Sequence, residues 1–196
     1  MINKTKNTNP FNSLIENRWS TRAFKPTKID QNKLNSILEA GTWAPSAFNE
    51  QPWRFIVGQK GNETFDKILD CLVEWNQKWA SGADVLVLNI GRRNFTHNNK
   101  PNPTFEYDLG QAVAFMAIEA VNQDLSSHQM SGFDAAKAAD IFNLGDGFKA
   151  VSVIAIGQYG ITNELADEFK ESDKAPRERK AFDSLVFNTA FKDQKQ

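Results

Sequence analysis

Residues 41–57 read G-T-W-A-P-S-A-F-N-E-Q-P-W-R-F-I-V and join the predicted end of a helix to a predicted strand. Gly41 suits the residue that ends a helix, and the apolar run 53–57 is typical of a buried strand. Between them, Pro45 and Pro52 fix two φ angles and restrict the residues before them. We therefore expect a stiff loop between the helix and the strand.

This loop carries amide and hydroxyl side chains among aromatic ones. They are Ser46, Asn49 and Gln51, beside Trp43, Phe48 and Trp53. Apolar walls with a few fixed donors and acceptors suit a flat, hydrogen-bonding ligand such as a flavin or a nucleobase. In the alternative interpretation, the polar side chains only satisfy the loop's own backbone.

Length and charge limit the classes of function. The chain has 196 residues, which suits one domain, and its 23 basic and 24 acidic side chains give a net charge of -1. We therefore expect neither nucleic acid nor a membrane surface as a partner. No apolar run approaches the ~20 residues of a membrane span, the N-terminus lacks a signal-like apolar core, and the lone Cys71 is predicted to be a packed thiol. These features favour a cytoplasmic protein.

Hydrophobic periodicity predicts alternating helices and strands. We expect a short helix after Asn9 and Pro10, and further helices over residues 30–41, 62–80, 106–125, 134–142 and 163–170. Strands are predicted over residues 53–57, 85–90 and 150–157, the last of them central. Residues 94–103 are predicted to be a mobile flap and residues 126–133 a loop. This order indicates an α/β or α+β protein.

The predicted helix 106–125 is apolar on nearly all sides. Between Leu109 and Val121 only Gln111 and Glu119 are polar. Such a helix must be covered on every side, and one small domain offers limited cover. We therefore expect an obligate homodimer built on this helix.

Few residues in the chain bring reactive chemistry of their own. No G-x-S-x-G, G-x-x-x-x-G-K-[ST] or G-x-G-x-x-G motif is present. His97 and His128 are the only histidines, so a catalytic zinc site is not expected, and His128 is predicted to be a hydrogen-bonding loop residue. An enzymatic function would thus require a bound cofactor.

Arginines alternate at both ends of the chain, as Arg18 and Arg22 with Ser20 between them, and as Arg177 and Arg179. Guanidinium groups match phosphate oxygens in a bidentate way, and a hydroxyl group can add a donor. Either pair alone is more typical of a solvated surface than of a binding site. If the two ends of the chain meet, we predict one phosphate site.

Four ordered motifs resemble the FMN-dependent nitroreductase family. They are R-W-S-T-R-A-F at 18–24, A-P-S-A-F-N-E-Q-P-W-R-F-I-V at 44–57, H-Q-M-S-G-F-D at 128–134 and R-E-R-K at 177–180. The resemblance covers about residues 9–186 of a single domain, 1–196, with flexible tails expected at 1–8 and 192–196. It implies an α+β sandwich with a mixed central β-sheet flanked by helices. It also implies a long buried helix at a homodimer interface and two FMN sites there.

The resemblance also implies cofactor-binding residues. These are Arg18, Trp19, Ser20, Arg22, Pro45, Ser46, Asn49, Gln51, Ser131, Gly132, Arg177 and Arg179. The arginines and Ser20 are expected around the phosphate, the ribityl chain and the pyrimidine edge. Pro45, Ser46 and Asn49 are expected beside the isoalloxazine, partly from the partner subunit. Gly132, with Ser131, is expected to present a backbone N–H to flavin N5. Trp19 and Ser131 depart from the common family pattern.

The function implied is transfer of a hydride from NAD(P)H through FMN N5 to an electron-poor acceptor, such as a nitroaromatic or a quinone. The kinetics would be ping-pong, with no catalytic side chain and no metal. One alternative is a flavin-binding or flavin-degrading relative, or a flavin carrier, without such turnover. Another is a module that binds phosphorylated ligands without flavin. The residues do not distinguish NADH from NADPH or identify the physiological acceptor.

Overall fold

The computed structural model describes residues 9–188. The predicted flexible tails, 1–8 and 192–196, lie outside these residues, and the assignment of 1–196 to a single domain stays a prediction. The helices are α1 Ser13–Asn17, α2 Gln31–Thr42, η1 Ala47–Asn49, α3 Glu63–Cys71, α4 Glu74–Ala80, α5 Phe105–Asn122, α6 Ala135–Ile141, η2 Thr162–Glu164, α7 Asp167–Lys174 and η3 Phe182–Ser184. The strands are β1 Trp53–Gln59, β2 Val85–Arg92, β3 Ser126–Met130 and β4 Phe148–Gly157.

The four strands form one sheet in the order β1-β2-β4-β3. The α+β class is confirmed, and β4 is central as predicted. The sheet is not mixed, however, because each of the three strand pairings within the described residues is antiparallel. Gln59 at the end of β1 pairs with Val85 at the start of β2, so α3 and α4 are an excursion within a hairpin connection. They are not a crossover to a parallel strand.

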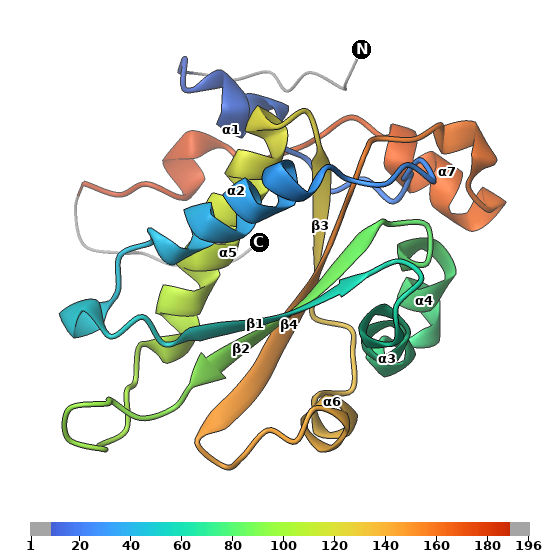
Figure 1. Ribbon diagram of the computed structural model, residues 1–196. Coiled ribbons are helices and arrows are strands. Elements are labelled where there is room, and N and C mark those ends of the chain that lie inside the picture. The colour runs from blue at the N-terminus through green and yellow to red at the C-terminus, as the bar shows by residue number, and fades with distance from the viewer. Residues whose placement is uncertain (1–8, 189–196) are drawn as a thin grey trace.

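Helices cover both faces of the sheet (Figure 1): α2 and α5 lie on one face, and α3, α4 and α6 lie on the other. Strand β2 shows how the sequence encodes two buried faces. Its side chains alternate, with Val85 and Val87 packed in the α2–α5 cluster and Leu86 and Leu88 packed in the opposite cluster. A continuous apolar run is what a strand covered on both sides requires. Cys71 is a buried free thiol, as predicted, and burial raises its pKa.

Helix α2 begins where the sequence predicts. The Asp30 side chain accepts hydrogen bonds from the backbone N–H groups of Asn32 and Lys33. The helix continues through Gly41 to Thr42, so Gly41 does not end it. A Cβ atom at Gly41 would lie 2.7 Å from Met116 Cε and 2.9 Å from Met116 Cγ. The glycine is therefore needed for the close approach of α2 to α5.

Four predicted elements differ from the structure, one of them the helix expected over residues 163–170, where the structure has η2 Thr162–Glu164 and α7 Asp167–Lys174. Residues 62–80 form two helices, because Leu72 and Val73 are extended, and Leu72 makes a β-bridge with Phe133. The first helix is capped by Asn12 and not by Asn9. Residues 126–130, predicted to be in a loop, form edge strand β3. Their polar composition hides a strand that forms through long-range pairing with β4.

His128 lies on β3 and ties this edge strand to the N-terminal segment. Its Nδ1 lies 2.9 Å from the carbonyl oxygen of Thr21, and its ring packs on Trp79 with 4.4 Å between ring centroids. The predicted hydrogen-bonding role is thus confirmed, but within a strand. Burial is the main cause that lowers the pKa of His128, to about 4. The imidazole is therefore neutral at pH 7 and donates from Nδ1.

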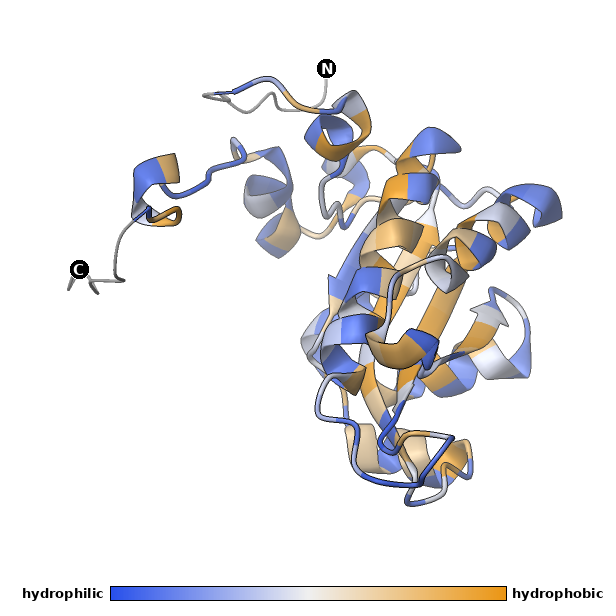
Figure 2. Cartoon of the chain, turned by 90° about the vertical axis from the view of Figure 1, so that its left-hand side faces the viewer, coloured by the Kyte–Doolittle hydropathy of each residue, from blue (hydrophilic) through white to orange (hydrophobic). Residues whose placement is uncertain are grey.

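The segment after α7 leaves the body of the molecule. Figure 2 shows it running away from the sheet toward the C-terminus, with apolar residues on its short helix. Phe182 is 52% exposed and Leu185 is 58% exposed. Large apolar side chains on an extended arm indicate a surface that another element covers. Within the described part of the chain, no helix combines the length and apolarity that crossing a membrane requires.

We expect Gly41→Ala to lower the free energy of unfolding. Alanine favours a helix by about 0.5–1 kcal/mol over glycine, but overpacking a buried contact costs about 1–3 kcal/mol. Met116 is fully buried and has little room to move aside. Urea unfolding should therefore show a net loss. The loss should shrink when Met116→Leu, which removes the terminal methyl group, is also present.

Gly145→Ala is the matched control for this pair, because a Cβ there meets nothing within 4 Å. It should change the unfolding free energy by less than about 0.5 kcal/mol. Equal effects at Gly41 and Gly145, or no coupling with Met116→Leu, would contradict the close helix contact.

His128 should make stability depend on pH. Its pKa falls from an ordinary 6.5 to about 4 on folding, so the unfolded state binds more protons between these values. Stability from this group is present above pH 6.5 and is lost as the pH falls toward 4, by about 2 kcal/mol between pH 7.5 and 4.5. Urea unfolding of wild type and His128→Gln over this range should show a shallower loss in the variant. Parallel pH profiles would show that His128 titrates normally in the native state.

Candidate functional site

Two ends of the chain meet at Arg18. Arg177 Nη1 donates to the carbonyl oxygen of Glu16 at 2.6 Å and to that of Arg18 at 3.1 Å. Arg18 and Arg177 are 159 residues apart in the sequence. Arg18 in turn donates from Nη1 to Ser20 Oγ at 3.3 Å. The C-terminal arginines thus lie beside the first arginine motif, as the sequence predicts for a shared site.

The guanidinium groups of Arg18, Arg177 and Arg179 repel one another. Burial, and then the charges of Arg179 and Arg177, lower the pKa of Arg18. Burial and Arg179 likewise lower the pKa of Arg177, which Glu16 partly offsets. The salt bridges found between residues 9 and 188 include neither Arg18 nor Arg179. This cluster therefore has an excess of positive charge that a bound anion would neutralise.

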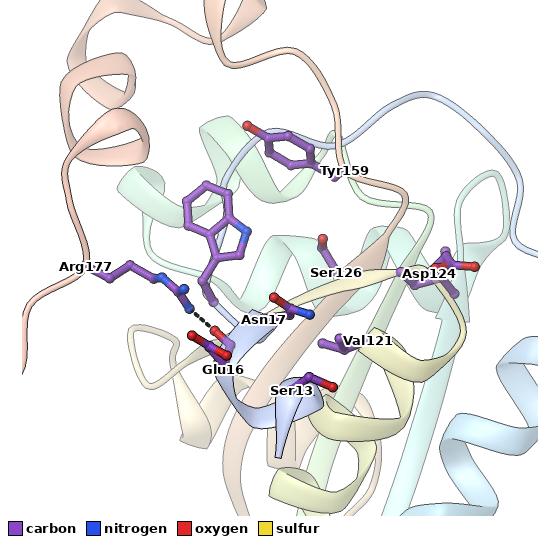
Figure 3. A pocket seen from close by; sticks show the side chains of 10 residues that line it. Ser13, Glu16, Asn17, Val121, Asp124, Ser126, Tyr159 and Arg177 are labelled. Atoms are coloured by element: carbon purple, nitrogen blue, oxygen red, sulfur yellow. Dashed lines mark hydrogen bonds between the residues drawn. The ribbon is translucent and has the colours of Figure 1, made fainter. Parts of the chain in front are cut away.

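A cavity of about 480 Å³ lies beside the arginine cluster. Figure 3 shows Arg177 reaching toward Glu16 at its edge, with Tyr159 and Ser126 at other sides. The lining residues are Ser13, Glu16, Asn17, Trp19, Val121, Asp124, Leu125, Ser126, Tyr159 and Arg177. Trp19 packs edge-on against Tyr159, and its buried Nε1 has no hydrogen-bond partner among the described residues. Trp19 thus lines the cavity and carries a buried donor behind its wall.

Arg22 is directed differently from Arg18. Its Nη1 donates to Ser172 Oγ at 3.2 Å, and its guanidinium carbon lies 5.9 Å from the Trp79 ring centroid and 6.0 Å from that of Phe169. These rings hold the cation by cation–π contacts. The buried Nε of Arg22 has no partner among residues 9–188. Arg22 therefore extends the site toward α4 and α7 and does not join the guanidinium cluster around Arg18.

Asp173 on α7 fixes this part of the chain. Its carboxylate is buried and accepts hydrogen bonds from Arg22 N at 2.8 Å, Thr21 Oγ1 at 3.1 Å and Thr162 Oγ1 at 2.7 Å. The sequence analysis missed Asp173, because it sits in a polar helix 151 residues after Arg22, where no local pattern marks it. It is a positioning residue for the arginine segment.

Strand β3 leads from the arginine cluster to Gly132. Ser126 at its start lines the cavity, His128 contacts Thr21, and Gly132 follows its end. The Gly132 carbonyl accepts from Val73 N at 3.1 Å and Asn76 Nδ2 at 2.9 Å. A Cβ atom there would lie 2.7 Å from Asn76 Nδ2, so a larger residue would displace the Asn76 amide from the Gly132 carbonyl oxygen. Ser131 beside it is exposed.

The loop before β1 has an unusual backbone and bonds to itself. Phe48, Asn49 and Gln51 all have positive φ, at 55°, 53° and 49°. Ser46 Oγ accepts from Gln51 N at 3.0 Å, and Gln51 Nε2 donates to the Asn49 carbonyl oxygen at 3.3 Å. For these two side chains the structure agrees with the alternative in which the loop satisfies its own backbone. Pro45 and Asn49 are exposed.

One chain does not bring this loop to the arginines. The loop is attached to the start of α5 by a hydrogen bond from Ala47 N to Asp108 Oδ2, at 3.2 Å, whereas Val121 near the end of α5 lines the cavity. Asp108 and Val121 are 13 residues apart on one helix, which corresponds to about 20 Å. The predicted residues therefore form two separate groups within one protomer.

Comparison with known proteins gives the family. The nitroreductase family model matches residues 15–78. An uncharacterized 15.4 kDa protein of Mycolicibacterium smegmatis is 32% identical over 145 residues, which is 68% of this chain and 94% of that protein. The major NAD(P)H-flavin oxidoreductase of Aliivibrio fischeri is 26% identical over 114 residues, which is 55% of this chain and 48% of that protein.

A solved structure described as the oxidoreductase containing FMN has a TM-score of 0.92, with 33% sequence identity and 97% of each chain covered. A nitroreductase family protein from Streptococcus pneumoniae shares the fold, with a TM-score of 0.73 at 18% identity over 90% of this chain and 98% of its own. The near-complete overlap at more than 30% identity confirms the resemblance drawn from the four motifs. This chain belongs to the nitroreductase family.

Proposed function

We propose that the protein is an NAD(P)H-dependent oxidoreductase that uses FMN. The observation that carries the proposal is the cluster of Arg18, Arg177 and Arg179, which has excess positive charge beside a cavity. Bound FMN would supply two-electron chemistry, accepting a hydride from NAD(P)H and giving it to an electron-poor acceptor such as a nitroaromatic or a quinone. The protein's own residues would bind and orient the reactants.

The described residues fit the phosphate end of such a cofactor. A phosphate dianion accepts several charge-assisted hydrogen bonds, and the three guanidinium groups with Ser20 provide cations and a hydroxyl donor. Two donors, Trp19 Nε1 and Arg22 Nε, have no hydrogen-bond partner among residues 9–188, and both lie on further residues predicted to bind the cofactor. Buried donors without a partner are rare in proteins, and a ligand with acceptor atoms would satisfy them.

The remaining residues would surround the flavin ring. We assign Gly132, with Ser131, to backbone contact near N5, because a side chain at position 132 would displace the Asn76 amide that bonds to its carbonyl oxygen. We assign Pro45, Ser46, Asn49 and Gln51 to the ring walls, contributed by the partner subunit. Their separation from the arginines along α5 supports this assignment, since one chain cannot place both groups on one flavin.

No side chain is assigned to acid–base catalysis. His128 is held by Thr21 and Trp79, and its low pKa keeps it neutral. The chain's role is therefore to exclude water and to position two substrates in turn on one face, which gives ping-pong kinetics. A relative that binds or degrades flavin without this turnover would differ in one test: anaerobic NADH or NADPH would not bleach its bound FMN.

We also propose an obligate homodimer in which α5 meets its copy. Tyr107 on α5 is 72% exposed and Phe115 is 44% exposed, and Gly110 and Ala114 on the same helix are exposed as well. Tyr107, Gly110 and Ala114 recur at spacings of three and four, and Phe115 adjoins Ala114, so these residues form an apolar stripe along the helix. Exposed Phe182 and Leu185 on the C-terminal arm are further apolar surface for a partner to cover.

Arg18→Ala and Arg179→Ala should each weaken FMN binding about tenfold or more, because each removes a charge-assisted hydrogen bond to the phosphate. Riboflavin, which lacks the phosphate, should lose less. The double variant should show coupling, since both side chains would contact one anion. Fluorescence titration of FMN and riboflavin measures all of these affinities.

Arg93→Ala is the matched control, because Arg93 is exposed on the loop after β2 and its side chain, within the described part of the protein, bonds to the Phe148 carbonyl oxygen and not to the arginine cluster. It should leave the affinity for FMN unchanged. Equal losses of FMN and riboflavin, or strictly additive losses in the double variant, would mean that Arg18 and Arg179 do not share a phosphate.

Ala114→Arg should dissociate the dimer. An unpaired charge placed in an apolar interface costs several kcal/mol, and twofold symmetry introduces it twice, so the dissociation constant should rise at least about a hundredfold. Sedimentation analysis should then find monomer with weakened FMN binding. Ala136→Arg, the same change at an exposed position on α6, should leave the dimer intact. A dimeric Ala114→Arg protein would contradict the assigned interface.

A further inference from the structure

Three aromatic side chains from two loops meet at the surface beside η1. Phe48 lies edge-on to Phe95, with 5.7 Å between ring centroids, and 5.8 Å from the ring of His97. Phe95 and His97 are 5.3 Å apart. We call Phe48, Phe95 and His97 the aromatic shelf.

Phe48 is held in a conformation that costs free energy. Its φ of 55° and ψ of 22° lie in the left-handed region, which residues other than glycine rarely adopt. The side chain gains little packing in return, because Phe48 is 83% exposed. A strained backbone that presents an exposed aromatic ring is more typical of a binding surface than of a folding element.

Glu50 clamps the two loops together. Its side chain is only 3% exposed and accepts hydrogen bonds from Thr96 N, at 2.6 Å, and from Thr96 Oγ1, at 3.1 Å. The segment around Thr96 was predicted to be a mobile flap. In the structure this segment forms a hydrogen-bonded turn, in which Phe95 N donates to Lys100 O and Asn102 N donates to Arg93 O, while its mobility stays a prediction. These bonds and the Glu50 contacts hold Phe95 beside Phe48.

His97 is oriented by the same clamp. The Asn98 side-chain amide lies 3.0 Å from His97 Nε2, and this nitrogen accepts if the amide donates. Nδ1 then carries the proton and faces Glu50 Oε2 at 3.8 Å. The imidazole plane is thus fixed beside the two phenyl rings.

The size and rim of the shelf indicate a small planar ligand. The exposed residues around it include Asn49, Asn98 and Lys100, which are polar. Three rings with a polar rim offer far less apolar surface than the roughly 800 Å² that each partner buries in a stable protein interface. The faces of Phe rings carry negative potential, so they attract an electron-poor ring.

We propose that the aromatic shelf receives the planar ring of the electron-poor acceptor, and that Glu50 positions the shelf. The inference rests on the proposed function, in which the neighbouring Ser46 and Asn49 form a wall of the flavin site. It extends that function by assigning acceptor specificity to Phe48, Phe95 and His97.

Binding of an aromatic nitro compound to the oxidised, FMN-loaded protein tests this. Phe48→Leu keeps an apolar side chain but removes the ring. It should weaken the binding of 4-nitrobenzoate, measured by equilibrium dialysis, about fivefold or more. Phe48→Tyr should restore binding to within about twofold of wild type. The affinity for FMN and the sedimentation coefficient should not change. Phe11→Leu is the matched control, because Phe11 is 48% exposed and lies before α1.

Glu50 is tested in the same assay. Glu50→Ala should weaken the binding of 4-nitrobenzoate about as much as Phe48→Leu does. Glu50→Gln can still bond to Thr96, so it should lose less of this affinity. Phe48→Gly should not lower the melting temperature, because glycine tolerates the positive φ. It should, however, weaken the binding of 4-nitrobenzoate. A lower melting temperature would make Phe48 a packing element and overturn the proposal.

Three other results of these experiments would also overturn the proposal. Unchanged 4-nitrobenzoate affinity in Phe48→Leu, with FMN bound normally, would overturn the shelf and leave the proposed function standing. Dissociation of the Phe48→Leu dimer would make the shelf a subunit contact instead. A wild-type protein that binds no FMN would overturn the proposed function and, with it, this inference.

Discussion

Mutual repulsion among Arg18, Arg177 and Arg179 is the constraint on which the site depends. Guanidinium groups stay charged at any physiological pH, so their crowding cannot be relieved by losing a proton. The fold nevertheless holds Arg177 beside Arg18, through bonds from Arg177 to the Glu16 and Arg18 carbonyl oxygens. Asp173 anchors the segment that carries Arg18 by accepting a hydrogen bond from Arg22 N. The phosphate of the proposed FMN would offset the repulsion and would therefore account for the cluster.

The position of α5 determines where the other predicted site residues lie. This helix separates the loop of residues 43–51 from the arginine cluster, because the loop is attached at one end and the cavity lies at the other. It also presents an apolar stripe to the surface. The proposed homodimer would account for both features, because a second copy would cover the stripe and bring its own loop to the first copy's arginines. Symmetry would then give two equivalent sites per dimer.

Local sequence signals predicted the elements that depend on local physics. Asp30 caps α2, and the apolar runs in β2 and β4 form the central strands, because capping and burial act over a few residues. The convergence of Arg18 with Arg177 was also predictable, since each motif lacked a complete set of phosphate ligands. Strand β3 was not predictable from local signals, because Ser126, Ser127 and His128 become a strand only by pairing with β4.

Other parts of the site could not be predicted for a similar reason. Arg22 points to Trp79 and Phe169, and Asp173 fixes its backbone, through contacts that span about 150 residues of sequence. Gly41 was taken for a helix end because its actual partner, Met116, lies on another helix. Glu50 likewise gave no local sign that it would clamp Thr96. In each case the decisive contact is tertiary, whereas sequence patterns report neighbours.

The phosphorus NMR signal of bound FMN tests the central claim most directly. A phosphate monoester has a second pKa of about 6, and nearby cations lower it by about 1–3 units. With three arginines around it, the bound phosphate should stay a dianion, and its chemical shift should not change between pH 8 and about 5.5. A shift that titrates near pH 6, as in free FMN, would show that the arginine cluster does not hold the phosphate.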